Sequence, residues 1–150
     1  MRVSTRVECG IIALMDMAVY SKSSETMTAG SIASRENLSV KYLEQIFTTL
    51  RQAKIIKGQK GSRGGYVIAK PAEKITVREI IDALDINILS DVSFEDYSEK
   101  TALADTLNAC VWDKMTERLQ TVASEITLAD LAEEYLNNSV SHKDSYMYFI

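Results

Sequence analysis

The chain has 150 residues, 46% of them hydrophobic, which is enough for one domain with a buried core and excludes a disordered chain. Its net charge of −4 divides unevenly: residues 1–70 hold 11 Lys and Arg against 5 Asp and Glu, whereas residues 71–150 hold 6 against 16. A basic half suggests a polyanionic partner. The apolar stretch of residues 11–19 contains Asp16 and lacks a cleavage-type pattern, so we expect a cytoplasmic protein without a membrane span.

Three helices are predicted in the first third of the chain. Apolar residues recur at helical spacing through residues 3–21, and this pattern predicts the first helix. Thr28 is a good N-cap for a short second helix, and Asn37 suits a tight left-handed turn after it. Ser39 is then an N-cap for a third helix over residues 40–53.

The third helix is strongly amphipathic. Its apolar face holds Leu43, Ile46, Phe47 and Leu50. Its opposite face is rich in hydrogen-bonding groups: Lys41, Gln45, Thr48 and Gln52, flanked by Glu44 and Thr49. A short helix, a turn and a helix of this kind are typical of a helix-turn-helix, in which such side chains reach bases or phosphates. Any exposed helix also has a polar face, so this pattern alone does not decide the function.

The glycine-rich stretch GQKGSRGGYVIAKP, residues 58–71, predicts a β-hairpin. Residues 55–59 and 65–70 are strand-like, and the glycines supply the positive φ values of a tight turn. Lys57, Lys60 and Arg63 would lie along this projecting ribbon. A basic hairpin directly after a helix-turn-helix is typical of a wing that contacts DNA. The phosphate-loop pattern GxxxxGK[ST], the main alternative for such glycines, is absent from the sequence.

The second half of the chain is acidic and predicts three further helices. Thr76 and Glu79 form a capping box for a helix over residues 77–85, and residues 86–100 are expected to be a linker. Residues 101–125 predict one amphipathic helix of roughly 37 Å. We expect its apolar stripe to form a homodimer interface, the alternative being that it packs within one chain. The stripe comprises Leu103, Leu107, Val111, Met115, Leu119 and Val122. Thr127 and Asp130 cap a final helix over residues 128–136.

Together these motifs resemble the Rrf2 family of dimeric winged helix-turn-helix bacterial regulators. The resemblance is carried by VSTRVECGIIAL, LSVKYLEQIFTTLRQAKII, GSRGGYVIAKP, ITVREIIDAL and ITLADLAEEY, in family order. It implies a mainly α fold with a small β-hairpin wing, with residues 1–85 as the DNA-binding domain and residues 86–150 as linker, dimerisation helix and tail. It also implies that the YLEQ helix enters the major groove of a palindromic operator. The expected DNA-binding residues are Thr28, Ser39, Lys41, Tyr42, Glu44, Gln45, Thr48, Thr49, Lys57, Lys60, Ser62 and Arg63.

Many members of this family bind an iron–sulfur cluster through three cysteines before the long helix. Residues 86–109 contain no cysteine, so we expect no cofactor and no metal. The branch most similar in appearance is that of the CymR-type repressors of cysteine metabolism, which act with cysteine synthase. Those repressors end, like this chain, in an aromatic run and an isoleucine. The resemblance implies that Tyr148, Phe149 and Ile150 dock into cysteine synthase, the alternative being that they pack on the dimer.

Other classes of function are weaker. The only histidine, His142, has no nucleophile motif beside it, and an enzyme is therefore not expected. An interaction-only regulator that does not bind DNA stays open, although the intact wing argues against it. Cys9 and Cys110 are expected to be buried and inert thiols, with a redox switch through them as the alternative.

Overall fold

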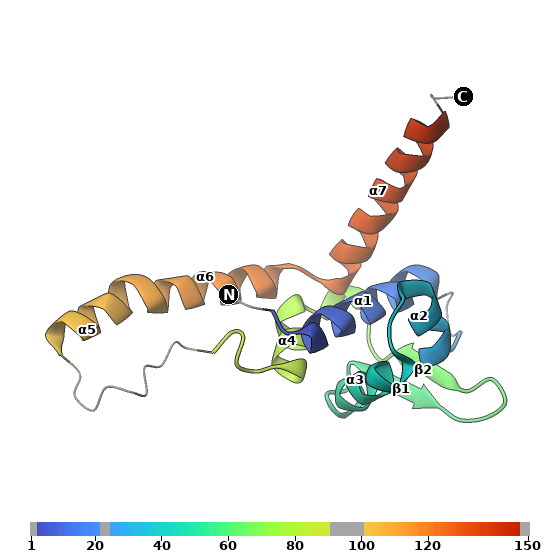
Figure 1. Cartoon of the computed structure of the whole chain (residues 1–150), viewed down its shortest axis with the longest axis horizontal. Coiled ribbons are helices and arrows are strands. Elements are labelled where there is room, and N and C mark those ends of the chain that lie inside the picture. The colour runs from blue at the N-terminus through green and yellow to red at the C-terminus, as the bar shows by residue number, and fades with distance from the viewer. Residues whose placement is uncertain (1–2, 22–24, 91–100, 148–150) are drawn as a thin grey trace.

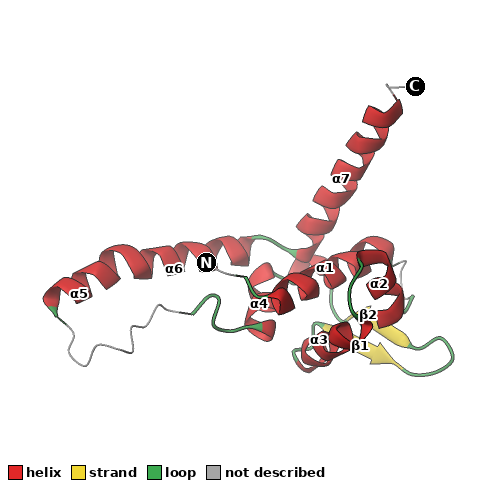
Figure 2. Ribbon diagram, viewed as in Figure 1, coloured by secondary structure: helices red, strands yellow, loops and turns green. Residues whose placement is uncertain are grey.

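The structure is a computed structural model that describes residues 3–21, 25–90 and 101–147, with the side chains of the last segment described as far as residue 141. It is mainly helical with one two-stranded antiparallel sheet (Figures 1 and 2). The winged part lies at one end, α5 and α6 form an arm that leads away from it, and α7 projects in another direction (Figure 1). No helix in these described ranges is long and apolar enough to cross a membrane.

The winged part is built from helices that begin where their caps predict. It contains α1 (Thr5–Tyr20), α2 (Ala29–Glu36), α3 (Val40–Gln52), β1 (Ile56–Gln59), β2 (Gly65–Ile68), a 3₁₀ turn (Ala72–Lys74) and α4 (Val77–Leu84). The side chains of Thr28, Ser39 and Thr76 each accept the backbone N–H three residues on. Asn37 ends α2 at φ 53°, in the left-handed region. These four sequence predictions are confirmed.

The core of the winged part is formed mainly by α1, α2, α3 and α4. The apolar face predicted for α3 is buried, with Leu43, Ile46, Phe47 and Leu50 all at 1% exposure or less. Gly10 allows α1 to pack closely on α4, because a Cβ at this position would lie 2.3 Å from Cδ1 of Leu84. The close α1–α4 contact joins α1, which packs on α2 and α3, to α4, the helix that precedes the second half of the chain.

The long helix predicted over residues 101–125 is present and contains a π-helical segment in its middle. It consists of α5 (Ala102–Leu107), a π-helical segment (Asn108–Trp112, labelled η2) and α6 (Asp113–Glu125). In an α-helix of 3.6 residues per turn, a stripe spaced by four residues drifts by about 40° at each step. A π segment has more residues per turn, so it turns the stripe back toward one face. The π segment lies inside the helical run that the sequence predicts and is not itself part of that prediction.

The final helix, α7 (Leu128–Met147), is longer than the predicted residues 128–136. Its capping box is complete: the Thr127 N–H donates to the Asp130 carboxylate and the Asp130 N–H donates to the Thr127 hydroxyl. The backbone around Thr127 also pairs with the segment before α4, through hydrogen bonds from Val77 N to Ile126 O and from Leu128 N to Ile75 O. Leu128 is fully buried in the same core as the winged part. The first turn of α7 is therefore anchored to the winged part.

Candidate nucleic-acid interface

The outer face of α3 is open to solvent. Lys41, Glu44, Gln45 and Thr48 are exposed, whereas Tyr42 is half-buried against the core. Burial of the opposite, apolar face fixes the rotation of the helix, so these polar side chains point away from the protein. Their arrangement matches the one predicted from the sequence.

Hydrogen bonds determine what each hydroxyl near this face can still do. Thr28 and Ser39 accept backbone N–H groups as N-caps, so their own O–H groups stay free to donate. The Thr48 hydroxyl donates to the Glu44 carbonyl at 3.0 Å and keeps only its lone pairs for another partner. Thr49 is half-buried and accepts from the Arg6 guanidinium of α1. Of the hydroxyls predicted to contact DNA, Thr49 is thus the one most engaged within the protein.

The wing is a hairpin whose glycines are required by close contacts. β1 and β2 pair in the register Ile56 with Ile68 to Gln59 with Gly65, and Gly61 turns at φ 118°. A Cβ on Gly64 would lie 2.9 Å from the carbonyl oxygens of Gln59 and Gly61. A Cβ on Gly65 would lie 2.7 Å from the carbonyl oxygen of Met27. The side chains of Lys57, Lys60, Ser62 and Arg63 are all exposed.

The segment before α2 holds the wing in place. Met27 and Tyr66 exchange backbone hydrogen bonds of 2.9 and 2.8 Å, so Met27 forms an isolated β-bridge with β2 of the hairpin. The Thr26 hydroxyl donates to the Arg63 carbonyl, and the Tyr66 ring packs edge-on against Phe47 of α3 with ring centroids 4.8 Å apart. The wing is therefore attached to both helices of the helix-turn-helix. The β-bridge at Met27 could not be predicted from the sequence, since a single residue leaves no period-2 pattern.

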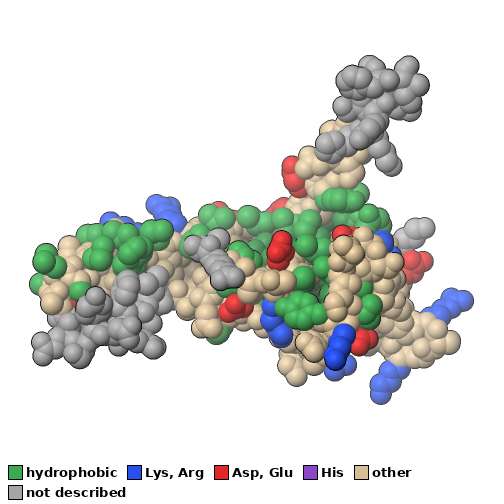
Figure 3. Space-filling model, in the orientation of Figure 1, with side chains coloured by type: hydrophobic (Ala, Val, Ile, Leu, Met, Phe, Trp, Pro, Cys, Tyr) green, Lys and Arg blue, Asp and Glu red, His purple; other side chains and the backbone are tan. Residues whose placement is uncertain are grey.

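The basic side chains of the interface form no ion pair with another described residue. The ion pairs among the described residues are Arg35 with Asp16, Lys70 with Glu79, and Arg78 with Asp82. Lys70 therefore turns away from the wing to α4, while Lys41, Lys57, Lys60 and Arg63 have no acidic partner in the part of the chain described here. Lys and Arg side chains extend from the wing end of the molecule in Figure 3. This exposed positive charge is suited to a polyanion.

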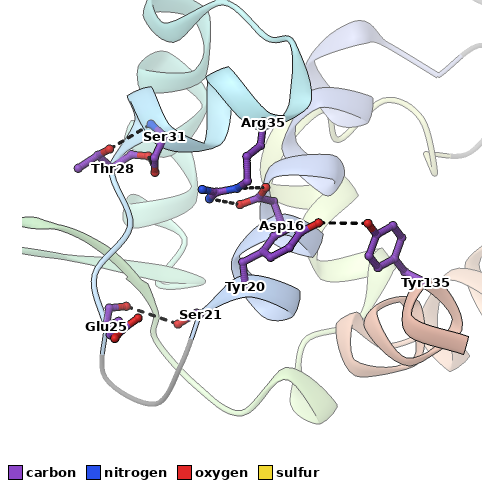
Figure 4. Close-up of polar contacts among 8 residues, drawn as sticks. All are labelled: Asp16, Tyr20, Ser21, Glu25, Thr28, Ser31, Arg35 and Tyr135. Carbon is purple, nitrogen blue, oxygen red and sulfur yellow. Dashed lines mark hydrogen bonds and ion pairs between the residues drawn. The ribbon is translucent and has the colours of Figure 1, made fainter. Parts of the chain in front are cut away.

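A group of polar contacts, buried at Asp16 and exposed at Tyr20 and Tyr135, joins α1, α2 and α7 (Figure 4). The Asp16 carboxylate is fully buried and accepts two hydrogen bonds from Arg35, of 2.9 and 2.7 Å. The Arg35 guanidinium lies over the Tyr20 ring, and the Tyr20 hydroxyl contacts the Tyr135 hydroxyl of α7 at 3.1 Å. This hydrogen bond raises the pKa of Tyr20 above its usual value. In the sequence, Asp16 is visible only as a charge within an apolar stretch.

Comparison with known proteins identifies the family. Residues 3–134 match the family described as Rrf2, iron-dependent transcriptional regulator. The chain belongs to the Rrf2 family. The IscR regulator of Cereibacter sphaeroides is 29% identical over 134 residues, which cover 87% of this chain and 86% of that protein. As a member of this family, the chain is a DNA-binding transcriptional regulator and not an enzyme.

Two solved structures of Rrf2 regulators have the same fold. CymR, the global cysteine regulator of B. subtilis, is 28% identical with a TM-score of 0.76, covering 89% of this chain and 98% of that chain. T. potens IscR is 32% identical with a TM-score of 0.71, covering 90% of this chain and 88% of that chain. The predicted fold class, mainly α with a hairpin wing, is thereby confirmed.

The iron in the family's description does not fit the donor set of this Rrf2 chain. Iron–sulfur clusters are held mainly by four thiolates, and the chain has two cysteines and one histidine. Cys9 is buried, and burial raises the pKa of its thiol, which disfavours the thiolate that a metal needs. Cys110 is exposed on the π segment in the part of the chain that the structure describes, so the expectation that both thiols are buried is wrong for this one.

Proposed function

We propose that this Rrf2 regulator is a homodimeric repressor of cysteine or sulfur metabolism genes. The observation that carries the DNA-binding part is the exposed, unpaired cations of the wing beside the exposed polar face of α3. In this proposal α3 enters the major groove, where Lys41, Gln45 and Thr48 contribute specificity, and Lys57, Lys60 and Arg63 contact phosphates. Two copies related by a two-fold axis would bind half-sites about 34 Å apart on a palindromic operator.

The proposal of a dimer rests on the apolar stripe of the arm. Leu103 is 83% exposed, and Met115 and Val122 are each 53% exposed. Figure 3 shows hydrophobic side chains along α5 and α6. A contiguous apolar face on a helical arm is suited to a second copy of the same face.

The proposal of a role in cysteine metabolism rests on similarity to CymR, the global cysteine regulator of B. subtilis. It extends to a complex with cysteine synthase through the C-terminal residues Tyr148, Phe149 and Ile150. These three residues lie outside the described residues, so the support for this step is the sequence of the tail alone.

Two experiments test these proposals. In DNase footprinting with DNA from upstream of sulfur metabolism genes, we expect a protected palindrome. If none of these DNA fragments is protected, the proposed regulation of sulfur metabolism genes is rejected.

In a titration of cysteine synthase followed by its pyridoxal phosphate fluorescence, we expect the intact chain to bind and a chain lacking Ile150 to lose that binding. Equal binding by both chains, or none by either, would reject docking through the tail.

A further inference from the structure

A basic cleft lies between the end of α3 and the wing. Its volume is about 320 Å³, and its lining residues are Arg51, Gly58, Gln59, Lys60, Gly65 and Tyr66. Arg51 is in the last turn of α3, whereas the other lining residues belong to the hairpin or its loop. Gly58 and Gly65 have no side chains, which leaves room between the two basic groups. Arg51 belongs to none of the contacts predicted from the sequence.

The charges in this cleft are not compensated. Arg51 and Lys60 are both exposed, and neither forms an ion pair with any acidic residue in the described ranges. Two cations that face one cleft repel each other, and an anion between them removes this repulsion. The planar fork of arginine suits a phosphate group in particular, and lysine adds a flexible point charge.

The two walls of the cleft are held at a fixed spacing. Tyr66 is bonded to Met27 on one side and packs against Phe47 of α3 on the other. The Thr26 hydroxyl holds the Arg63 carbonyl at the tip of the wing. Because the hairpin is attached to α3 in this way, the backbone positions from which Arg51 and Lys60 extend are set before any ligand binds. Such preorganisation lowers the entropic cost of binding.

We propose that Arg51 and Lys60 together bind one backbone phosphate of the operator, in the cleft between α3 and the wing. This inference rests on the proposed DNA-binding function and names a positioning contact within it. A phosphate contact carries no sequence information, but it fixes the register of α3 in the groove. A free nucleotide is a poorer occupant, because exposed cations continue from the cleft along the wing to Arg63, as a continuous polyanion requires.

The test is the salt dependence of operator binding by Arg51→Ala, Lys60→Ala and the double variant. Each bound phosphate contributes about 0.9 to the slope of log K against log salt concentration. If both residues hold the same phosphate, the double variant loses about 0.9 in slope relative to the unmodified protein, and its affinity falls about 10-fold or more at low salt. Two separate phosphates would instead give a loss of about 1.8.

A matched control is Lys54→Asn. Lys54 is an exposed cation three residues after Arg51 that does not line the cleft, and its φ of 60° is one that asparagine tolerates. We expect this variant to keep the slope of the unmodified protein. A slope loss of about 1.8 in the double variant, or an affinity of Arg51→Ala equal to that of the unmodified protein at low salt, would overturn the shared phosphate. Failure of the unmodified protein to bind any DNA would instead reject the proposed function, so the two failures are distinguishable.

Discussion

At the scale of single residues, Asp16 is the one charged side chain that is buried among the described residues. A buried carboxylate is unstable without a partner, and Arg35 supplies it with two hydrogen bonds. Glu36 lies beside this pair, and its hydrogen bond with Asp16, together with burial, raises the pKa of the Glu36 carboxyl above its usual value. This polar group secures α2, the first helix of the DNA-binding motif, to α1.

Replacing Arg35 by alanine should therefore lower the free energy of unfolding by about 2–3 kcal/mol, less than for a fully buried pair because the Arg35 side chain is partly exposed. Urea denaturation measures this change. The control is Arg78→Ala, which breaks an exposed pair with Asp82 on the surface of α4 and should cost about 0.5 kcal/mol or less. Equal losses in the two variants would contradict a special role for the buried pair.

The raised pKa of Glu36 predicts a pH effect with a definite sign. The native protein holds this proton more tightly than the unfolded chain, whose value is near 4.5, so stability falls as pH rises through the raised native value. Glu36→Gln keeps a hydrogen-bond donor toward Asp16 at every pH. We expect this variant to have a higher Tm than the unmodified protein at pH 7 and an equal Tm near pH 4. A Tm difference that is independent of pH would contradict the carboxyl–carboxylate contact.

At the scale of elements, the wing depends on its glycines. Gly65 lies at φ 158°, and a Cβ there would meet the Met27 carbonyl at 2.7 Å, so a side chain must push the segment around Met27 away from the hairpin. Because the β-bridge between Met27 and Tyr66 attaches the wing to the helix-turn-helix, the effect on the wing should exceed the effect on the core. The π segment of the arm is a second feature at this scale. In the sequence it is visible only as a slow drift of the apolar stripe around the helix.

We expect Gly65→Ala to cost about 1–3 kcal/mol of stability and to weaken binding to all DNA sequences alike. Thermal unfolding and a filter-binding titration measure the two effects. The matched control is Gly30→Ala in the first turn of α2, where a Cβ meets nothing closer than the Thr28 hydroxyl at 3.9 Å. That variant should be neutral or stabilising by about 0.5–1 kcal/mol. If Gly65→Ala changes neither stability nor DNA binding, the wing does not need the β-bridge at Met27.

At the scale of the whole molecule, the apolar arm connects DNA binding to assembly in the proposed dimer. α6 is held to the winged part by the backbone pairing at Thr127 and by a hydrogen bond from Gln120 to the Leu89 carbonyl, while α5 extends beyond these contacts. An arm with one exposed apolar face can align two winged parts at a fixed spacing if the faces pair. The dimer and the two half-sites are therefore one prediction rather than two.

Met115→Glu places a charge in the middle of this stripe and should weaken a dimer about 100-fold or more, because a charge buried at the seam has no partner. Light scattering after size-exclusion chromatography measures the mass. Thr121→Glu adds the same charge on the outer side of α6, where the side chain is exposed, and should leave the mass unchanged. If Met115→Glu stays a dimer, another surface must form the interface.

Features that depend on neighbours within a few residues could be predicted from the amino-acid sequence. Caps at Thr28, Ser39 and Thr76, the buried face of α3 and the glycine turn of the wing follow from local hydrogen bonding, helical periodicity and φ preferences. Contacts between distant segments emerge only in the folded chain: the pairing of Asp16 with Arg35, the β-bridge at Met27, and the cleft that brings Arg51 to the wing. The physical reason is that such contacts depend on how whole elements pack, which no local pattern of residues records.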